Sequence, residues 1–180
     1  MRRWMITLAA LAAATGVRAG EIENPEYKGW TGCKPGALVR IQMDTETSGQ
    51  KIQMEMTHKL TEMTAEKAVI ETTTVMKVSG QTIEQPPQSR DVPAKIEEVK
   101  PPEGAVNVAK PEEGDEEIEV AGKKTKCHWV KTTTEVSGTK AHSKVWQCPE
   151  IPGGMAKMET TMEGPAAGST TMTVVEFKKE

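Results

Sequence analysis

Two runs of this chain match each other residue by residue about one short turn. If residues 137–138 form a two-residue loop, Cys127 faces Cys148 and Trp129 faces Trp146. Two-residue loops that contain glycine are typical of β-hairpins. The two cysteines then fall on a rung without backbone hydrogen bonds, where Cα atoms lie about 4.5 Å apart, which a disulfide accepts. The spacing therefore predicts a β-hairpin cross-linked by a Cys127–Cys148 disulfide, a structural staple rather than a redox switch.

The same Ser-Gly turn recurs at residues 48–49 and 79–80, each time between runs rich in Thr, Val, Ile and Met. About the first turn, apolar residues alternate with polar ones on both arms, and only one register places them on a common face. We expect this face to be buried and to be lined by Val39, Ile41, Met43, Ile52, Met54 and Met56.

These patterns predict an all-β protein, an antiparallel meander that forms a curved sheet or an incomplete barrel. Strands are expected within residues 37–85 and 118–178, and no stretch after residue 19 has sustained helical periodicity. Between them, residues 86–117 contain six prolines and end in an acidic run. Because proline removes a ladder donor, we expect a long irregular Pro-rich acidic connection, either a solvated linker or a lid over the sheet.

The first 19 residues have the pattern of a secretory signal peptide. Arg2 and Arg3 precede an apolar stretch, and small residues flank a cleavage point before Gly20. The apolar stretch is shorter than the roughly 20 residues that span a bilayer. We therefore expect export to the periplasm or the exterior, with residues 20–180 as a single β domain and no transmembrane segment.

The charge and the cysteine count limit the functions that this protein can have. Without the leader, 20 Lys and Arg stand against 26 Asp and Glu, a formal charge of −6. An acidic chain without a basic patch argues against nucleic-acid binding. Of the three cysteines, Cys33 is left over, and we expect it to be a buried inert thiol or else a reactive or intermolecular one.

No catalytic motif is visible, and we expect a protein that is not an enzyme and has no cofactor. His128 and His142 point to opposite faces of their hairpin because side chains alternate, and His58 belongs to another hairpin. A metal site made from these histidines is not expected.

The candidate ligand-binding residues are the apolar ones that the hairpins bring together: Met43, Met54, Met56, Trp129 and Trp146. Methionine adapts to varied apolar partners, so these residues are suited to line a groove for a hydrophobic small molecule or lipid. Thioether clusters also bind Cu(I), a soft ion. The favoured function is an exported, non-catalytic cell-envelope protein that binds an apolar or amphipathic ligand on a curved sheet. The alternatives are a structural or interaction protein of the envelope and methionine-based copper binding.

The run KVWQCPEIPGGMAKME at residues 144–159 resembles the late strands of small uncharacterised secreted bacterial β-proteins. In those proteins a Trp, a Pro-Gly pair and an apolar-Lys-apolar strand recur, and their layout is similar to that of open-barrel periplasmic proteins of the lipoprotein-carrier type. The resemblance covers about 60 residues at the C-terminal end. It implies a curved open sheet; the helices that plug the sheet of the carrier family have no evident counterpart in this sequence, and the resemblance transfers no binding residue.

Overall fold

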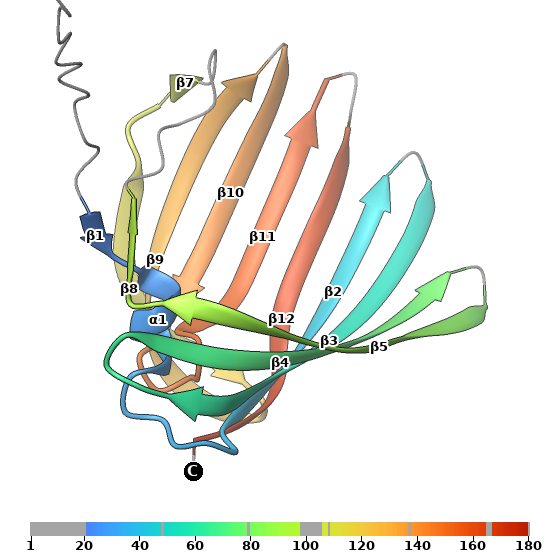
Figure 1. Cartoon of the computed structure of the whole chain (residues 1–180). Coiled ribbons are helices and arrows are strands. Elements are labelled where there is room, and N and C mark those ends of the chain that lie inside the picture. Colours follow the sequence, from blue (N-terminus) through green and yellow to red (C-terminus); the bar gives the residue numbers. More distant parts are fainter. Residues whose placement is uncertain are drawn as a thin grey trace, which may run out of the picture.

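The structure is a computed structural model that describes residues 21–47, 49–78, 80–97, 106–107, 109–136, 138–164 and 167–179. A ten-stranded antiparallel sheet dominates it, in the order β5-β4-β3-β2-β12-β11-β10-β9-β7, with β8 paired to β9 outside that path (Figure 1). The strands of this sheet are β2 (Leu38–Thr47), β3 (Gln50–Met63), β4 (Lys67–Val78), β5 (Gln81–Pro93), β7 (Val106–Asn107), β8 (Glu112–Val120), β9 (Lys123–Val136), β10 (Thr139–Gln147), β11 (Met155–Glu163) and β12 (Gly168–Lys178). A small sheet pairs β1 (Glu21–Glu23) with β6 (Lys95–Glu97), and α1 spans Pro25–Trp30. The all-β prediction is confirmed.

The hairpins have the registers that the sequence predicts. Met43 pairs with Met54 across β2 and β3, and Trp129 pairs with Trp146 across β9 and β10. Cys127 and Cys148 form a disulfide with their Cα atoms 4.5 Å apart. The three serines of the Ser-Gly turns lie outside the described residues, but Gly138 has a φ of 78°, in the left-handed region that glycine adopts without strain.

The main sheet consists of two meanders joined in the middle. Strands β2 to β5 run outward to one edge, and β12 back to β9 run outward to the other. The junction pairs β2 with β12, and it sets Met43 opposite Met172 and Ile41 opposite Val174. Residues about 130 positions apart in the chain therefore share rows across the sheet.

The sheet curves strongly, and its core lies at the end where α1 sits inside the curve (Figure 1). Asn24 caps the helix by accepting a hydrogen bond from the Glu26 N–H, and Pro25 occupies the first turn, where its missing donor costs nothing. A Cβ on Gly29 would lie 2.4 Å from the carbonyl carbon of Gly153, so only glycine permits this close approach of helix and loop. The buried side chains around α1 are Tyr27, Trp30, Cys33, Ala37, Val39, Ile41, Leu60, Ala68, Ile70, Val92, Val120, Cys127, Trp146, Cys148, Ile151, Ala156 and Val174.

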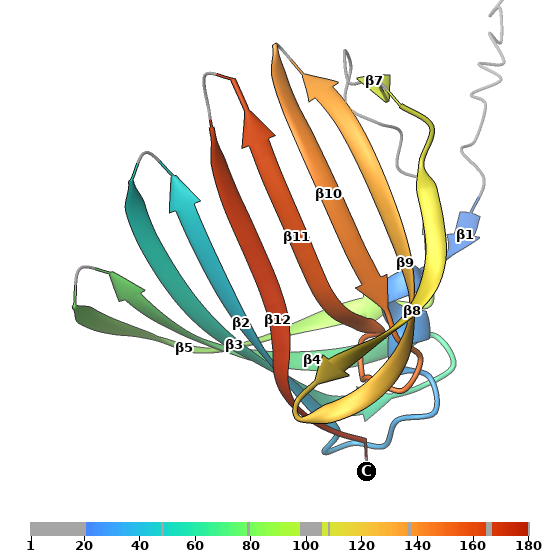
Figure 2. The same ribbon diagram turned by 180° about the vertical axis from the view of Figure 1, so that it is seen from behind.

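The lower part of the β8–β9 hairpin crosses toward the end of β12, in front of the sheet in the view of Figure 2. β8 contacts β12 there, and the Lys123 ammonium lies 5.5 Å from the centre of the Phe177 ring. The hairpin thus covers the end of β12 around Phe177.

The prediction of an irregular connection over residues 86–117 is wrong at both of its ends. Residues 86–93 continue β5, and residues 112–117 belong to β8. Within the main sheet β5 pairs with β4 alone, and Pro86 and Pro87 lie where the register shifts between Thr72 and Thr74. An edge strand and a bulge are the two places in a sheet that tolerate proline. Residues 98–105 and 108 of this segment lie outside the described residues, as does the predicted leader at 1–19.

The prediction for the first hairpin is confirmed for the alternation, since the six residues share one face. It is wrong for the burial of part of that face. Val39 and Ile41 are buried, whereas Met43, Met54 and Met56 are half-buried, and Ile52 is 36% exposed. The reason is that α1 covers this face at one end of the sheet, while toward the hairpin tips the described residues place no second layer over it.

Candidate functional site

A row of methionines crosses the concave face of the sheet. Met76, Met54, Met43, Met172 and Met158 are consecutive cross-strand partners on β4, β3, β2, β12 and β11. Ile83 extends the row at one end, and Val145 and Val130 extend it at the other. We call these eight residues the methionine row. Its methionines are half-buried, so thioethers and alkyl groups remain accessible on this face.

A second row lies two residues closer to the hairpin tips, about 7 Å along the strands. It consists of five consecutive hydroxyl residues on β2, β12, β11, β10 and β9, which we call the hydroxyl row: Thr45, Thr170, Thr160, Ser143 and Thr132. The Thr45 and Thr170 hydroxyls are 3.2 Å apart, and those of Ser143 and Thr160 are 3.0 Å apart. A hydroxyl has one donor and two acceptor positions, so each pair keeps hydrogen-bonding capacity for a third group.

On the other side of the methionine row the face closes toward α1. Val174 and Ile41 are 1% and 5% exposed, and beyond them the Arg90 guanidinium binds both carboxylate oxygens of Glu26, one of them at 3.0 Å. This contact raises the pKa of Arg90, through the hydrogen bond to Glu26 first. The face therefore passes from hydroxyls through thioethers to a closed aliphatic end.

The three central rows of the concave face are uncharged. The hydroxyl row, the methionine row and the row of Met56, Ile41 and Val174 contain no Asp, Glu, Lys or Arg. The residues that alternate with them form ion pairs on the convex side, such as Arg40 with Glu176 at 2.7 Å. Strand alternation thus leaves these three rows without charge, while charged groups of the concave face lie outside them, with Arg90 at the closed end and Glu113 opposite Val130 at the β8 edge.

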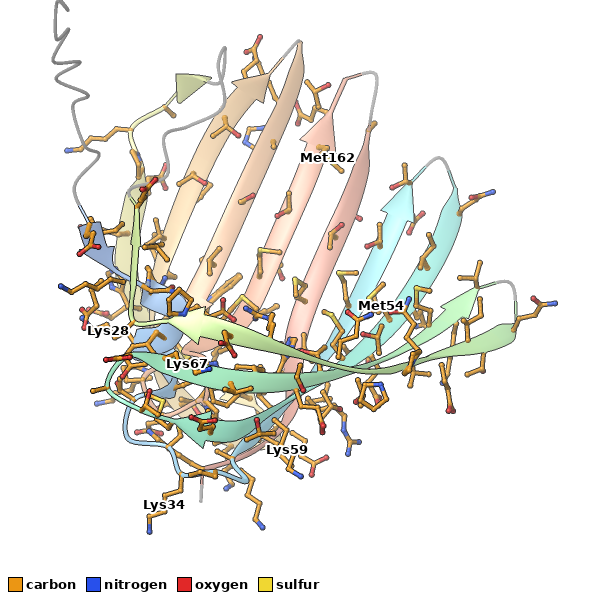
Figure 3. All side chains as sticks on the ribbon, viewed as in Figure 1. Lys28, Lys34, Met54, Lys59, Lys67 and Met162 are labelled. Carbon is orange, nitrogen blue, oxygen red and sulfur yellow. A yellow bond between two sulfur atoms is a disulfide. The ribbon has the colours of Figure 1, made fainter. Side chains whose placement is uncertain are left out.

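The two tryptophans of the predicted ligand site are on the convex face, away from the methionines. Val145 belongs to the methionine row, so its neighbour Trp146 points to the other side of β10. The predicted site residues therefore divide into Met43, Met54 and Met56 on one face and Trp129 and Trp146 on the other. Figure 3 labels Met54 on β3 and Met162 on β11, in the two meanders that contribute to the concave side.

The convex tryptophans form a cluster with three charged groups. The Lys144 ammonium lies 4.6 Å from the centre of the Trp129 ring and 4.4 Å from that of Trp146. Glu116 accepts hydrogen bonds from Lys144, at 2.9 Å, and from the Trp146 indole N–H. These bonds, that of Lys144 first, lower the pKa of Glu116. Lys157 approaches the Trp146 ring to 5.1 Å. Because Glu116 is bound to both Lys144 and the Trp146 indole, and Lys157 is paired with Glu159 at 2.6 Å, the arrangement is that of a structural cluster.

Two further titratable groups lie near the closed end. His58 is on the concave face, its Nδ1 2.8 Å from the Thr72 hydroxyl, and burial, followed by the charge of Arg90, lowers its pKa. The spacing is that of a nucleophile and its base, but the nearby carboxylate of Glu26 is held by Arg90 and does not orient the ring. Cys33 is a buried free cysteine, and burial raises the pKa of its thiol.

Two hollows, of about 190 and 600 Å³, lie over strands β2 to β4. Their walls are mostly residues of the charged convex face, such as Glu55, Lys77 and Asp44. Met54 of the methionine row contributes to the wall of the smaller hollow, and Thr45 of the hydroxyl row contributes to that of the larger one.

His128 and His142 point to opposite faces, as predicted, since they pair with Gln147 and Thr133 in the register of β9 and β10. Across the described part of the chain, no group of three His, Cys, Asp or Glu side chains is placed to hold a metal ion. Thioethers are a separate donor class that suits soft ions. In the same part of the chain, no helix has the length and apolar character needed to cross a membrane.

The sequence predicts some residues of the methionine row but not all of them. Met43 and Met54 follow from one hairpin, but their alignment with Met172 and Met158 depends on the β2–β12 junction, which has no local signal. Met76 was overlooked although it lies in a strand with the same alternation. Counting outward from the turn at residues 79–80 places Met76 opposite Ile83.

The arrangement of strands is similar to two crystal structures. One is a candidate lipoprotein from Parabacteroides distasonis, with a TM-score of 0.47 and 10% identity over 81% of this chain and 96% of that chain. The other is a candidate exported protein with YmcC-like fold from Bacteroides fragilis, with a TM-score of 0.46 and 8% identity over 82% and 97%. No protein-family model and no curated protein matches the chain. The function is therefore argued from this chain's own residues.

Proposed function

We propose that this is an exported, non-catalytic protein that binds an apolar or amphipathic ligand on the concave face of its sheet. The observation that carries the proposal is the methionine row, eight apolar side chains on neighbouring strands, none of them charged. Extended apolar patches on soluble proteins mark interaction sites. Methionine side chains, flexible and polarizable, adapt to ligands of irregular shape.

Export is supported by two features of the chain. The Cys127–Cys148 disulfide is of the kind that persists in oxidising compartments and is rare in the cytosol. The leader-like pattern of residues 1–19 agrees with it. N-terminal sequencing of the exported protein should begin at Gly20, and a start at Met1 would contradict the proposal.

A pair of adjacent substitutions tests the binding face. Met43→Glu places a carboxylate in the methionine row, whereas Gln42→Glu places it on the convex face of the same strand. In a titration of the mature protein with the uncharged fluorescent probe N-phenyl-1-naphthylamine, we expect Met43→Glu to abolish binding and Gln42→Glu to leave it unchanged. Equal behaviour of the two variants, or no binding by the unmodified protein, would refute the proposal. Native mass spectrometry of the mature protein is expected to show a co-purified apolar ligand.

Copper binding is the second candidate, because five thioethers in successive strands are a donor set for Cu(I). Cross-strand neighbours have Cβ atoms about 5 Å apart, which lets the sulfurs of Met54, Met43 and Met172 converge on one ion. A Met43→Leu/Met172→Leu variant keeps the apolar volume and removes two sulfurs. Loss of Cu(I) affinity with retention of probe binding would support the copper site, while loss of neither would exclude these sulfurs as ligands.

A further inference from the structure

Along the direction of the strands, the side chains of the concave face change from polar to apolar. This sequence of side chains indicates how an amphipathic ligand would lie on the face. From the hairpin tips toward α1, the rows are hydroxyl, then methionine, then the buried residues Ile41 and Val174. From Thr45 to Ile41 the strand advances about 13 Å. A molecule that enters from the tips with its apolar end first would meet alkyl and thioether groups, and its polar end would stop among hydroxyls.

The charge distribution restricts the polar end. No member of the hydroxyl or methionine row is a lysine or arginine that could bind a carboxylate or phosphate, and no cross-strand neighbour of Thr45, Thr170, Thr160 or Ser143 is an acid that could bind an ammonium group. An acid of this face, Glu113, lies at the β8 edge opposite Val130, where its carboxylate is 3.7 Å from His128 Nε2. A charged group taken out of water without a partner is strongly penalised. Arg90 does not fill this role, because it lies at the closed end and binds Glu26.

The hydroxyl row offers the complementary chemistry. Its five side chains are half-buried, and hydroxyls both donate and accept hydrogen bonds. A head group with several hydroxyls of its own, such as a glycosyl or glycerol group, can bond to successive members of the row.

We propose, building on the binding function above, that the ligand is an uncharged amphiphile with a hydroxyl-rich head group. Its head lies on the hydroxyl row, and its apolar chain crosses the methionine row and points toward α1. Thr45, Thr170, Thr160 and Ser143 select the head group, and the missing charges exclude fatty acids and phospholipids.

Three amphiphiles with the same dodecyl chain length test the head group: dodecyl maltoside, laurate and dodecyltrimethylammonium, each below its micelle concentration. Displacement of N-phenyl-1-naphthylamine from the mature protein measures their affinities. We expect the maltoside to bind at least about tenfold more tightly than either charged compound, the free energy of one or two hydrogen bonds. Intrinsic fluorescence is a poor readout, because Trp129 and Trp146 are on the other face.

Variants locate the selectivity. Thr170→Val removes a hydroxyl of the row at constant shape and should weaken maltoside binding about fivefold, while binding of the naphthylamine probe is unchanged. Thr171→Val, one residue along and on the convex face, is the matched control. Thr170→Lys should shift the preference toward laurate.

The outcomes separate this inference from the proposed function. Equal affinities for the three amphiphiles, or a preference for a charged one, would overturn the head-group assignment and leave apolar binding in place. Failure of the naphthylamine probe and all three amphiphiles to bind would refute both. Weakening by Thr171→Val as strong as that by Thr170→Val would also refute the assignment of the hydroxyl row.

Discussion

Val145 and Trp146 are neighbours in β10, but they lie in different environments. Val145 is half-buried in the methionine row on the concave face. Trp146 is 5% exposed on the convex face, where Trp129 and Glu116 enclose it next to the disulfided part of β9. In this region the convex side of a curved sheet is better covered than the concave side. Strand alternation decides to which face a residue belongs, but whether that face is covered depends on elements elsewhere in the chain.

This contrast separates stability from binding. The convex cluster is closed, charge-paired and cross-linked, so substitutions there should change the free energy of unfolding. The concave rows beyond Val174 are open, so substitutions there should mainly change ligand affinity.

The largest effect is expected from truncating the two neighbours. Trp146→Ala should lower the free energy of unfolding by about 3–5 kcal/mol, because it empties a closed site. Val145→Ala, half-buried on the open face, should cost about 1 kcal/mol. Urea unfolding of the two variants measures the difference. If Val145→Ala were the more destabilising variant, the concave face would be the better-packed one in this region, contrary to this assignment.

Removal of the disulfide is the next largest change. Cys127 and Cys148 are 21 residues apart, and a cross-link of that loop stabilises by about 3 kcal/mol on the chain-entropy model. The Cys127→Ala/Cys148→Ala variant should unfold at correspondingly lower urea but bind N-phenyl-1-naphthylamine normally while folded. Cys33→Ala, which removes the free thiol, is the control. Loss of probe binding in the folded double variant would show that the two faces are not independent.

A smaller effect is expected from the cation of the convex cluster. Lys144→Met removes contacts with two indole rings and the partner of Glu116, and cation–π contacts at partly exposed sites contribute about 0.5–1 kcal/mol each. We expect a loss of about 1 kcal/mol in urea unfolding. Lys140→Met, an exposed position on the same strand, should have no measurable effect. Equal values for the two variants would mean that the rings do not stabilise the ammonium group.

The sequence predicts the parts of this fold that depend on neighbouring residues. Each hairpin has a turn signal and two alternating arms, so the register of β2 with β3 and of β9 with β10 follows from counting. The pairing of β2 with β12 depends on the whole chain, and no local pattern reveals it. The candidate site inherits this limit: Met43 and Met54 were predicted together, whereas Met172 and Met158 joined them only in the structure.

The prolines and tryptophans show how the remaining predictions failed. Pro86 and Pro87 argue against a central strand, but they fit an edge strand at a bulge, and the sequence does not say which strand is at the edge. Trp129 and Trp146 were grouped with the methionines because all are large and apolar. Assigning them to a face requires the registers of β10 with β11, of β11 with β12 and of β12 with β2, because these three pairings together relate the two hairpins.

The smallest effect is expected in the loss of stability at acidic pH. One titratable group on each face should contribute to this loss in a different pH range. The pKa of His58 on the concave face is lowered, by burial first and then by Arg90, with Glu26 opposing. The unfolded chain, with a histidine pKa of about 6.5, therefore binds the proton more tightly, and stability is lost as the pH falls below that value. The pKa of Glu116 on the convex face is also lowered, so its contribution is present above the unfolded glutamate value of about 4.3 and is lost as the pH falls below it.

Urea midpoints measured between pH 7 and pH 3 should therefore show two separate declines. His58→Gln should reduce the decline that begins near pH 6.5 and leave the lower one, while Glu116→Gln should reduce the lower decline and leave the upper one. Arg90 stays charged through the upper window, because its raised pKa keeps the guanidinium protonated throughout it. If His58→Gln left the upper decline intact, His58 would not be shielded from water in the folded protein. The concave face near Thr72 would then be open to solvent, and the closed end of that face would begin nearer to α1 than Val174.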